Sequence, residues 1–411
     1  MKRRPILVLH YSEVWLKGCN RPFFVSKLRE AVQRNLADLP VRYDGHVAGR
    51  LVLRAETEEA AQEAVERLRR TPGVQNIGLG YACAPELDAI VEIGAELMCR
   101  NKSATFAVRA KRSTKQLPFR SLQVERVLGE RILREDRESG GILAVDLDHP
   151  ESVCWVEATS EEAFIYTNKT TGCGGLPTNT GGRLGCLLSG GIDSAAAAYK
   201  IIRRGVKLTF VHFWGAPARP GEESAPVARE IVKQLTLYQG RSRLYLVPFD
   251  DIQKEVVISA PEEFRLLIYR RIMLRICERL ARFHDGRGTV TGDCISQVAS
   301  QTLRNMEAIE AVARYPIYRP LCGDDKQEII ALARQIGTYE ISNQPFTDCC
   351  PMYLPKSPRI FSSVQELDQA ESHLEIDRLV EQGLQSVRRE IYEYEKGEVV
   401  LKSVRERKQA A

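Results

Sequence analysis

The chain has 411 residues, of which 44% are hydrophobic and 27% are charged, and its formal net charge is +5. This composition is ordinary for a globular protein, and the length allows two or three domains. No apolar run approaches the roughly 18 residues of a membrane-spanning helix. The N-terminal apolar run stops at His10, too early for the core of a signal peptide. We therefore expect a cytoplasmic protein.

The cysteines argue against a disulfide framework. There are eleven, an odd number, and no two of them form a C-x-x-C pair. Most are expected to be small apolar side chains in the core. Cys349 and Cys350 are the exception, because adjacent cysteines beside Pro351 are unusual as core packing.

Two α+β units are expected before residue 170. In the first, the expected elements are strands at 6–11 and 51–53, a helix at 23–36, and a charged helix running from an N-cap at Thr57 to Arg70. In the second, they are strands at 106–109, 154–157 and 163–167, with a helix at 121–133. Glycine and proline then mark a linker at 172–182.

From residue 184 onward, strands and helices alternate. The predicted strands are 185–188, 206–213, 243–248, 288–292 and 317–321, and the predicted helices are 193–204, 227–239, 262–283, 297–312 and 325–336. This alternation is typical of a doubly wound parallel sheet. Ligands bind such sheets at the C-terminal ends of the strands.

The turn 189–194, Ser-Gly-Gly-Ile-Asp-Ser, lies at such a strand end. Its glycines allow a ligand to approach the backbone, and the first helical turn presents N–H groups that favour an anion. Ser189 and Ser194 add hydroxyl groups. The turn is not a Walker A loop, which requires G-x-x-x-x-G-K-[ST]. It resembles the SGGxDS signature of PP-loop ATP pyrophosphatases; the alternative is an ordinary strand–turn–helix connection.

Further segments resemble the ThiI-type tRNA 4-thiouridine synthetases over nearly the whole chain. They are 10–21, 106–112, 121–129, 174–177, 189–194, 291–293, 297–303, 319–321 and 355–358. The resemblance implies an N-terminal ferredoxin-like domain (1–58), a THUMP RNA-binding domain (59–168), a linker (169–183) and a PP-loop catalytic domain (184–400). The chain is similar to the short members that lack a rhodanese-like domain.

Two residues depart from the family pattern. Ala195 stands where the family usually has proline, and SGGIDSA also occurs in NAD synthetases. Ser12 replaces a common glycine. The lack of a rhodanese-like domain leaves the sulfur donor open, and makes a role in thiamine biosynthesis less expected.

The resemblance implies that ATP adenylates uridine O4, which turns a poor leaving group into AMP. The implied ATP-binding residues are Leu187, Leu188, Ser189, Gly190, Gly191, Ser194, Phe213, Trp214, Arg270 (or its neighbour Arg271), Gly292 and Gln301. Asp193 is the candidate catalytic carboxylate, in contact with Mg²⁺ or the reacting phosphate; the alternative is a plain helix-start carboxylate. For the two leucines, core packing is the rival role, and Asp293 could cap a helix.

Cys349 and Cys350 are the other catalytic candidates. A thiolate can carry a terminal sulfur as a persulfide, supplied by a cysteine desulfurase, and a neighbouring thiol can resolve the product. The resemblance favours Cys349 as the carrier. An iron–sulfur cluster is ranked lower because this loop lacks C-x-x-C-like spacing, and no resident metal ligands are assigned.

The expected RNA contacts are basic residues of the THUMP-like segment. They are Arg109, Lys111, Arg112, Lys115 and Arg120, which would meet tRNA backbone phosphates; Arg109 could instead pair with a carboxylate inside the sheet. The leading hypothesis is therefore a tRNA sulfurtransferase that forms 4-thiouridine at position 8, with a homodimer also allowed. The alternatives are another PP-loop adenylating enzyme, such as an amidating synthetase, and a non-catalytic tRNA-binding protein.

Overall fold

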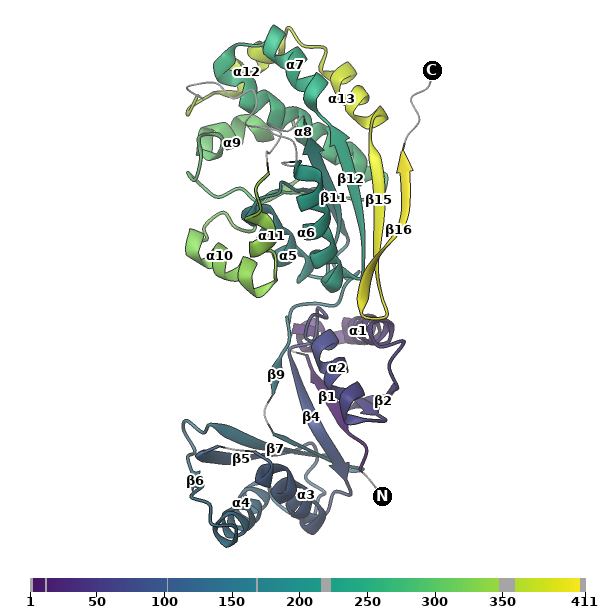
Figure 1. Ribbon diagram of the computed structural model, residues 1–411, viewed down its shortest axis with the longest axis vertical. Coiled ribbons are helices and arrows are strands. Elements are labelled where there is room, and N and C mark those ends of the chain that lie inside the picture. The colour runs from purple at the N-terminus through teal and green to yellow at the C-terminus, as the bar shows by residue number, and fades with distance from the viewer. Residues whose placement is uncertain are drawn as a thin grey trace. The chain divides into compact units, whose positions relative to one another are not determined.

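The computed structural model describes residues 3–11, 13–101, 103–167, 169–215, 223–346 and 359–406. The chain divides into two compact units, Met1–Pro177 and Thr178–Ala411 (Figure 1). Each unit is built around its own sheet. Among the described helices, none is long and apolar enough to cross a bilayer.

The first unit contains a nine-stranded sheet in the order β2-β3-β1-β4-β8-β7-β5-β6, with β9 paired to β4. The strands are β1 (Ile6–His10), β2 (Val41–Val47), β3 (Arg50–Ala55), β4 (Asn76–Cys83), β5 (Thr105–Arg112), β6 (Ala144–Val145), β7 (Ser152–Ala158), β8 (Ala163–Thr167) and β9 (Thr170–Thr171). The antiparallel pair β4·β8 joins the N-terminal strands to the later ones, so both predicted α+β regions share one sheet.

Two pairs of helices cover this sheet over two separate apolar cores. The paired helices are α1 (Arg21–Asn35) with α2 (Glu58–Leu68) and α3 (Leu87–Cys99) with α4 (Ser121–Glu138), and the 3₁₀ helix η1 (Glu13–Asn20) precedes α1. Residues of α1 and α2 pack with β1 and β3, whereas residues of α3 and α4 pack with β5, β7 and β8. Thr57 caps α2 as predicted, because its hydroxyl accepts from the Ala60 N–H at 3.2 Å.

The second unit contains a seven-stranded sheet in the order β14-β13-β10-β11-β12-β15-β16. The strands are β10 (Arg183–Leu187), β11 (Lys207–Trp214), β12 (Arg241–Pro248), β13 (Thr289–Val290), β14 (Ile317–Tyr318), β15 (Arg388–Glu395) and β16 (Glu398–Glu406). The strands from β14 to β12 pair in parallel, which confirms the predicted doubly wound sheet. The antiparallel hairpin β15–β16 at one edge was not predicted.

Helices flank this second sheet (Figure 1). They are α5 (Ile192–Ile202), α6 (Ser224–Gln239), α7 (Asp250–Ser259), η2 (Glu262–Phe264), α8 (Arg265–Arg282), η3 (Ala299–Gln301), α9 (Leu303–Glu310), α10 (Lys326–Gln335), α11 (Tyr339–Ser342), α12 (Val364–Glu371) and α13 (Ile376–Gln385). The prediction of one helix at 297–312 was wrong. Thr302 ends the preceding 3₁₀ turn and caps α9 through the Asn305 N–H, at 3.3 Å.

The strand order reverses at β10, which places a topological switch point between β10 and β13. From β10 the chain moves outward to β11 and β12 on one side, and β13 and β14 lie on the other side. In open parallel sheets, ligands bind in the crevice beyond the strand ends at this point. The turn 189–194 directly follows β10, and residues 291–293 directly follow β13.

Candidate functional site

Hydrogen bonds within the turn 189–194 hold its two serines together. The hydroxyl groups of Ser189 and Ser194 are 3.1 Å apart, and the Gly191 N–H donates to the Ser189 hydroxyl at 3.2 Å. Ser194 also donates to the Gly191 carbonyl at 3.1 Å. No side chain caps the start of α5. The turn therefore places the N-terminus of α5 at the switch point, where its N–H groups and positive dipole end favour an anion.

Close packing, and not a left-handed backbone, requires glycine at positions 190 and 292. Gly191 has φ −80° and ψ 160°, a conformation open to any residue. A Cβ at Gly190 would lie 2.5 Å from the ring of Phe346. A Cβ at Gly292 would lie 2.7 Å from the Ser194 backbone nitrogen. The close neighbour of Gly292, which the resemblance assigns to ATP, is therefore the backbone of α5.

Asp193 lies in the first turn of α5 and has two partners that the sequence analysis missed. Its Oδ1 is 2.5 Å from Lys326 Nζ, and its Oδ2 accepts from Gln297 Nε2 at 2.9 Å. Lys326 is the first residue of α10, directly after the N-cap Asp325. A capping signal before a basic residue was visible in the sequence, but only the fold shows that α10 begins next to α5.

Asp293 is a buried carboxylate beside the turn. Its Oδ1 accepts from Arg270 and from Gln301 Nε2, the latter at 3.3 Å, and its Oδ2 accepts from the Thr291 hydroxyl at 2.7 Å. Arg319 Nε is 3.6 Å from Oδ2. Burial opposes ionisation of this group, but the neighbouring Arg270, Thr291 and Arg319 keep its pKa below the usual value. Asp293 therefore remains charged and holds Arg270 at the switch point.

The structure distinguishes Arg270 from its neighbour Arg271. The Arg271 side chain is completely buried, and it donates to the Ala308 carbonyl at 2.8 Å and to Asp368 and Glu371 at 2.7 and 3.0 Å. These bonds tie α8 to α9 and α12. Arg270 points instead toward Asp293 and donates to the Ser300 hydroxyl at 3.0 Å. Of the two arginines, Arg270 is therefore the one beside the candidate nucleotide site.

The four apolar residues assigned to ATP do not form one surface. Leu188 is buried, and Leu187 packs on the main core of the unit. Phe213 is buried against Phe249, with their ring centroids 5.2 Å apart. Trp214 is 37% exposed and lines a different hollow, with Pro226 and Pro248. Successive strand residues point to opposite faces, so Phe213 and Trp214 do not present their rings together.

The Gln301 side chain is buried, with its amide nitrogen on Asp293 and its oxygen 3.4 Å from the Cys294 N–H. Both ends of this amide are therefore already engaged. Cys349 and Cys350 lie outside the described residues.

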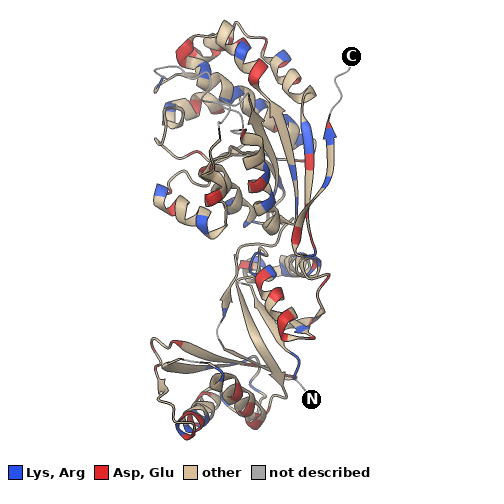
Figure 2. Ribbon diagram, viewed as in Figure 1, with Lys and Arg blue, Asp and Glu red and all other residues tan. Residues whose placement is uncertain are grey.

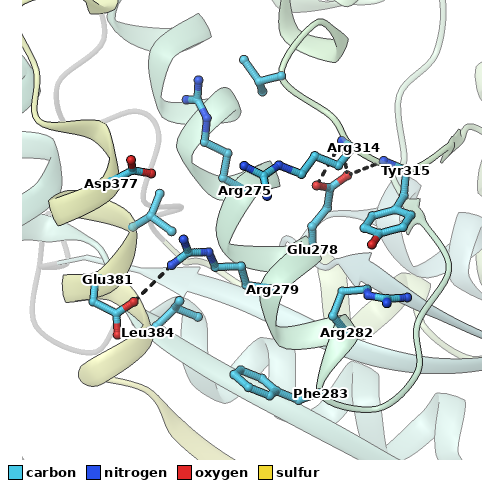
Figure 3. Close-up of a pocket in the computed structure, with 12 residues that line it drawn as sticks. Arg275, Glu278, Arg279, Arg282, Phe283, Arg314, Tyr315, Asp377, Glu381 and Leu384 are labelled. Carbon is cyan, nitrogen blue, oxygen red and sulfur yellow. Dashed lines mark hydrogen bonds and ion pairs between the residues drawn. The ribbon is translucent and has the colours of Figure 1, made fainter.

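A pocket of about 770 Å³ lies on the other half of α8 (Figure 3). Its charges are largely satisfied within the protein: Arg275 makes two 3.0 Å contacts with Glu371, and Arg279 is 3.1 Å from Glu381. Burial raises the pKa of Glu278, which accepts from two backbone N–H groups of the neighbouring loop. Much of the arginine-rich segment 265–282 thus serves internal ion pairs.

In the first unit, a small hollow of about 270 Å³ lies over a buried carboxylate, Glu157. Glu157 is paired with Arg50, accepts from the Tyr166 hydroxyl, and lies 2.8 Å from His10 Nε2. Burial alone would raise its pKa, but the His10 and Arg50 contacts lower the pKa to about 2. These partners come from β1, β3 and β8, and Glu157 itself lies on β7, so Glu157 links the strands of the sheet.

Basic side chains line the same hollow. Arg109, Lys111 and Lys169 surround Trp155, and Lys169 Nζ lies 3.4 Å from the centre of a Trp155 ring. Arg109 also donates to the Leu147 carbonyl. By contrast, acidic and basic residues alternate along α4 (Figure 2). A concave surface with cations around an aromatic ring suits an RNA backbone or base.

The other predicted RNA contacts are separated by the fold. The Arg112 guanidinium donates to the carbonyls of Phe119 and Leu117, and so shapes the loop before α4. Lys115 and Arg120 are exposed on that loop. Lys111 and Arg109 thus lie in the hollow, whereas Arg112 acts within the loop.

A cluster of three or more potential metal ligands is not found among the described histidine, cysteine, aspartate and glutamate residues. Asp193 is the partly exposed carboxylate within the turn, whereas Asp293 beside it is buried. A single carboxylate is compatible with Mg²⁺, which is usually held by one or two carboxylates together with substrate phosphates and water.

Three family models match the chain. They are described as Thiamine biosynthesis protein (ThiI), over residues 179–376, the ThiI ferredoxin-like domain, over residues 6–78, and the THUMP domain, over residues 86–168.

Curated relatives match over nearly their full length. A protein named probable tRNA sulfurtransferase from Moorella thermoacetica is 36% identical over 381 residues, which cover 93% of this chain and 96% of that protein. A protein of the same name from Thermus thermophilus is 37% identical over 389 residues, covering 95% and 94%.

Two of the similar solved structures match most of this chain. One, described as a 4-thiouridine synthetase–RNA complex with bound ATP, has a TM-score of 0.82 and 32% identity, and the match covers 95% of this chain and 100% of that chain. The other, PH1313 from Pyrococcus horikoshii, has a TM-score of 0.61 and 21% identity, covering 81% and 99%. At that identity the second structure supports the fold alone.

Proposed function

Since this chain belongs to the ThiI family of tRNA sulfurtransferases, we propose that it is an ATP-dependent enzyme that forms 4-thiouridine at position 8 of tRNA. The observation that carries the proposal is the turn 189–194 at the switch point, with Asp193 held by Lys326. The similarity over nearly the whole chain to relatives named for this activity supports a tRNA sulfurtransferase over an amidating synthetase or a non-catalytic RNA-binding protein.

In the first step, ATP would bind with its phosphates at the turn. The N–H groups at the start of α5 and the Arg270 and Lys326 cations would face the phosphates. Uridine O4 attacks the α-phosphorus, diphosphate leaves, and N3 loses its proton. The target uridine must leave its stack to reach this site.

Mg²⁺ is the expected metal of this step. Asp193 would hold it, in place of its present contact with Lys326. The ion would neutralise charge on the departing diphosphate. Lys326 would then be free to contact a phosphate oxygen.

In the second step, we assign sulfur transfer to Cys349 and Cys350. Cys349 follows Phe346 by three residues, and the Phe346 ring lies against Gly190 of the turn. A persulfide on Cys349, loaded by a cysteine desulfurase, attacks C4 through its terminal sulfur, and AMP leaves. The Cys350 thiolate then attacks the Cys349 sulfur, which forms a Cys349–Cys350 disulfide and releases the 4-thiouridine sulfur. A thiol reductant restores the pair.

The first unit would hold the tRNA, with Lys111 and Arg109 in the hollow over Trp155 and with Lys115 and Arg120 on the adjacent loop. Such contacts position an RNA by shape and charge. The proposed domain limits remain 1–58, 59–168, 169–183 and 184–400, and the proposed location is the cytoplasm.

The test is a reaction of the purified protein with ATP, Mg²⁺, unmodified tRNA and a persulfide donor. Released diphosphate and AMP report the first step, and nucleoside mass spectrometry reports 4-thiouridine. Asp193→Asn is expected to reduce diphosphate release on the order of 100-fold. Cys349→Ser is expected to abolish 4-thiouridine while diphosphate is still released.

Cys99→Ser is the matched control, because Cys99 is an exposed cysteine on α3 in the first unit. It is expected to behave as wild type. If wild-type protein with tRNA never converts ATP to AMP and diphosphate, the proposed function is wrong.

A further inference from the structure

We propose that Asp293 is a positioning residue that fixes Arg270 and Gln301 for the nucleotide reaction without touching the nucleotide itself; this inference rests on the proposed function. Asp293 follows Gly292 at the end of β13, on the opposite side of the switch point from the turn 189–194. In the sequence analysis, capping a helix was an alternative role for Asp293. The structure gives that role to Thr302, which caps α9.

Each carboxylate oxygen of Asp293 has two neighbours. Oδ1 accepts from Arg270 and, at 3.3 Å, from Gln301; Oδ2 accepts from Thr291 at 2.7 Å and faces Arg319 at 3.6 Å. These groups surround the carboxylate, and the residue is only 7% exposed. A nucleotide in the crevice would therefore meet the groups that Asp293 holds rather than Asp293 itself.

Arg270 is the group that remains accessible. Its side chain is 26% exposed, and its two terminal nitrogens are directed by Asp293 and by the Ser300 hydroxyl, the latter at 3.0 Å. An arginine held at two points loses less conformational freedom when it binds a phosphate than a freely rotating one. Asp293 thus orients the Arg270 guanidinium group before ATP binds.

Gln301 has a bracing role in the same arrangement. Its amide nitrogen donates to Asp293, and its oxygen accepts from the Cys294 N–H at 3.4 Å. These two bonds fix the orientation of the amide. They connect η3 to the segment after β13, and so keep Ser300 beside Arg270.

The test is a double-mutant cycle between Asp293 and Arg270, read as kcat/KM for ATP in diphosphate release. Asp293→Asn keeps the size of the side chain and removes its charge. In the wild-type background it is expected to lower kcat/KM on the order of 10- to 100-fold. In an Arg270→Ala background, Asp293→Asn is expected to lower kcat/KM by less than about a further threefold, because Asp293 acts through Arg270.

Thr291→Val provides a second variant in case Asp293→Asn folds poorly. It removes one hydrogen bond from the carboxylate and keeps the charge, and it is expected to lower kcat/KM by about two- to fivefold. Asp368→Asn is the matched control. Asp368 pairs with Arg271, the next residue on α8, and its side chain is 60% exposed. The control is expected to stay within about twofold of wild type.

Equal losses from Asp293→Asn in both backgrounds would overturn the inference, since they would indicate a general structural role. An unchanged kcat/KM in Arg270→Ala would also overturn it, while leaving the proposed function intact. A wild-type protein that releases no diphosphate is the separate result that contradicts the proposed function.

Discussion

Glu157 in the first unit and Asp293 in the second have similar chemistry and different consequences. Both are buried carboxylates, 5% and 7% exposed, and both are paired with arginine. In both, burial opposes ionisation and neighbouring cations lower the pKa. The environment of the carboxylate alone therefore does not separate a structural role from a functional one.

The difference lies in the arginine. The partner of Glu157 is Arg50, whose side chain is 8% exposed and belongs to strand β3. The partner of Asp293 is Arg270, which is 26% exposed at the switch point. A buried arginine ties strands together, whereas a partly exposed one can still meet a ligand. The exposure of the cation thus indicates the role of the carboxylate.

The largest expected effect is on stability, from Glu157→Ala. The substitution leaves Arg50 buried without its carboxylate and removes the acceptor of the Tyr166 hydroxyl. Breaking a buried ion pair from one side typically costs about 3–5 kcal/mol. The measurement is the free energy of unfolding of the first unit, followed by urea and tryptophan fluorescence near Trp155.

Glu130→Gln is the control for this substitution. Glu130 pairs with Arg126 on the exposed face of α4, with side chains 67% and 77% exposed. Its loss is expected to cost less than about 1 kcal/mol. Similar costs for the two substitutions would contradict the structural role of Glu157.

The pH dependence of unfolding tests the same carboxylate with Glu157→Gln, a substitution that keeps the size of the side chain and so leaves no cavity. The pKa of Glu157 falls from 4.5 to about 2 on folding. A lowered folded pKa means that the stabilisation is complete above pH 4.5 and is lost as the pH falls toward 2. The free-energy difference between wild type and Glu157→Gln is thus expected to shrink by about 3 kcal/mol over that interval. A difference that stays constant down to pH 2 would show that ionised Glu157 contributes nothing.

Next in size is Gly292→Ala, which tests whether the position of Asp293 depends on its neighbour. The added Cβ would lie 2.7 Å from the Ser194 backbone nitrogen, and backbone cannot move aside cheaply. We expect a loss of about 1–3 kcal/mol in the stability of the second unit, with reduced ATP turnover. Gly191→Ala is the control for the loss of stability, because its Cβ would meet only the Ser189 hydroxyl, at 3.4 Å. Equal losses would indicate that crowding against α5 is not the cause.

Much of the fold could be predicted because local patterns agree with it. The strand–helix alternation after residue 184 gave the parallel sheet, and Thr57 marked the start of α2. The hairpin β15–β16 was missed because β15 begins with three consecutive charged residues, and only 392–395 alternate tyrosine and glutamate. Helix α7 was missed because the next predicted helix began only at residue 262, and residues 250–259 were assigned to no element.

The site was predictable where its residues are contiguous and not where they are distant. The turn 189–194 could be predicted because its contiguous residues determine its local conformation. The contact of Lys326 with Asp193 joins residues 133 positions apart, and spacing along the chain contains no information about it. Arg270 and Arg271 are adjacent, so only the packing of α8 shows which one faces the core.

The smallest expected effect concerns RNA binding, and it compares two neighbours on β5. Lys111 is exposed and lines the hollow over Trp155, whereas Arg112 donates to the carbonyls of Leu117 and Phe119. A cation that neutralises one phosphate releases about one counterion. Lys111→Gln is therefore expected to reduce the slope of log affinity for tRNA against log salt by about 1. Arg112→Gln is expected to leave the slope unchanged and to lower the stability of the first unit by about 1–2 kcal/mol. The opposite result, a changed slope for Arg112→Gln alone, would mean that Arg112 leaves its loop to bind RNA. The exposed fraction of a basic side chain would then not indicate its function in this unit.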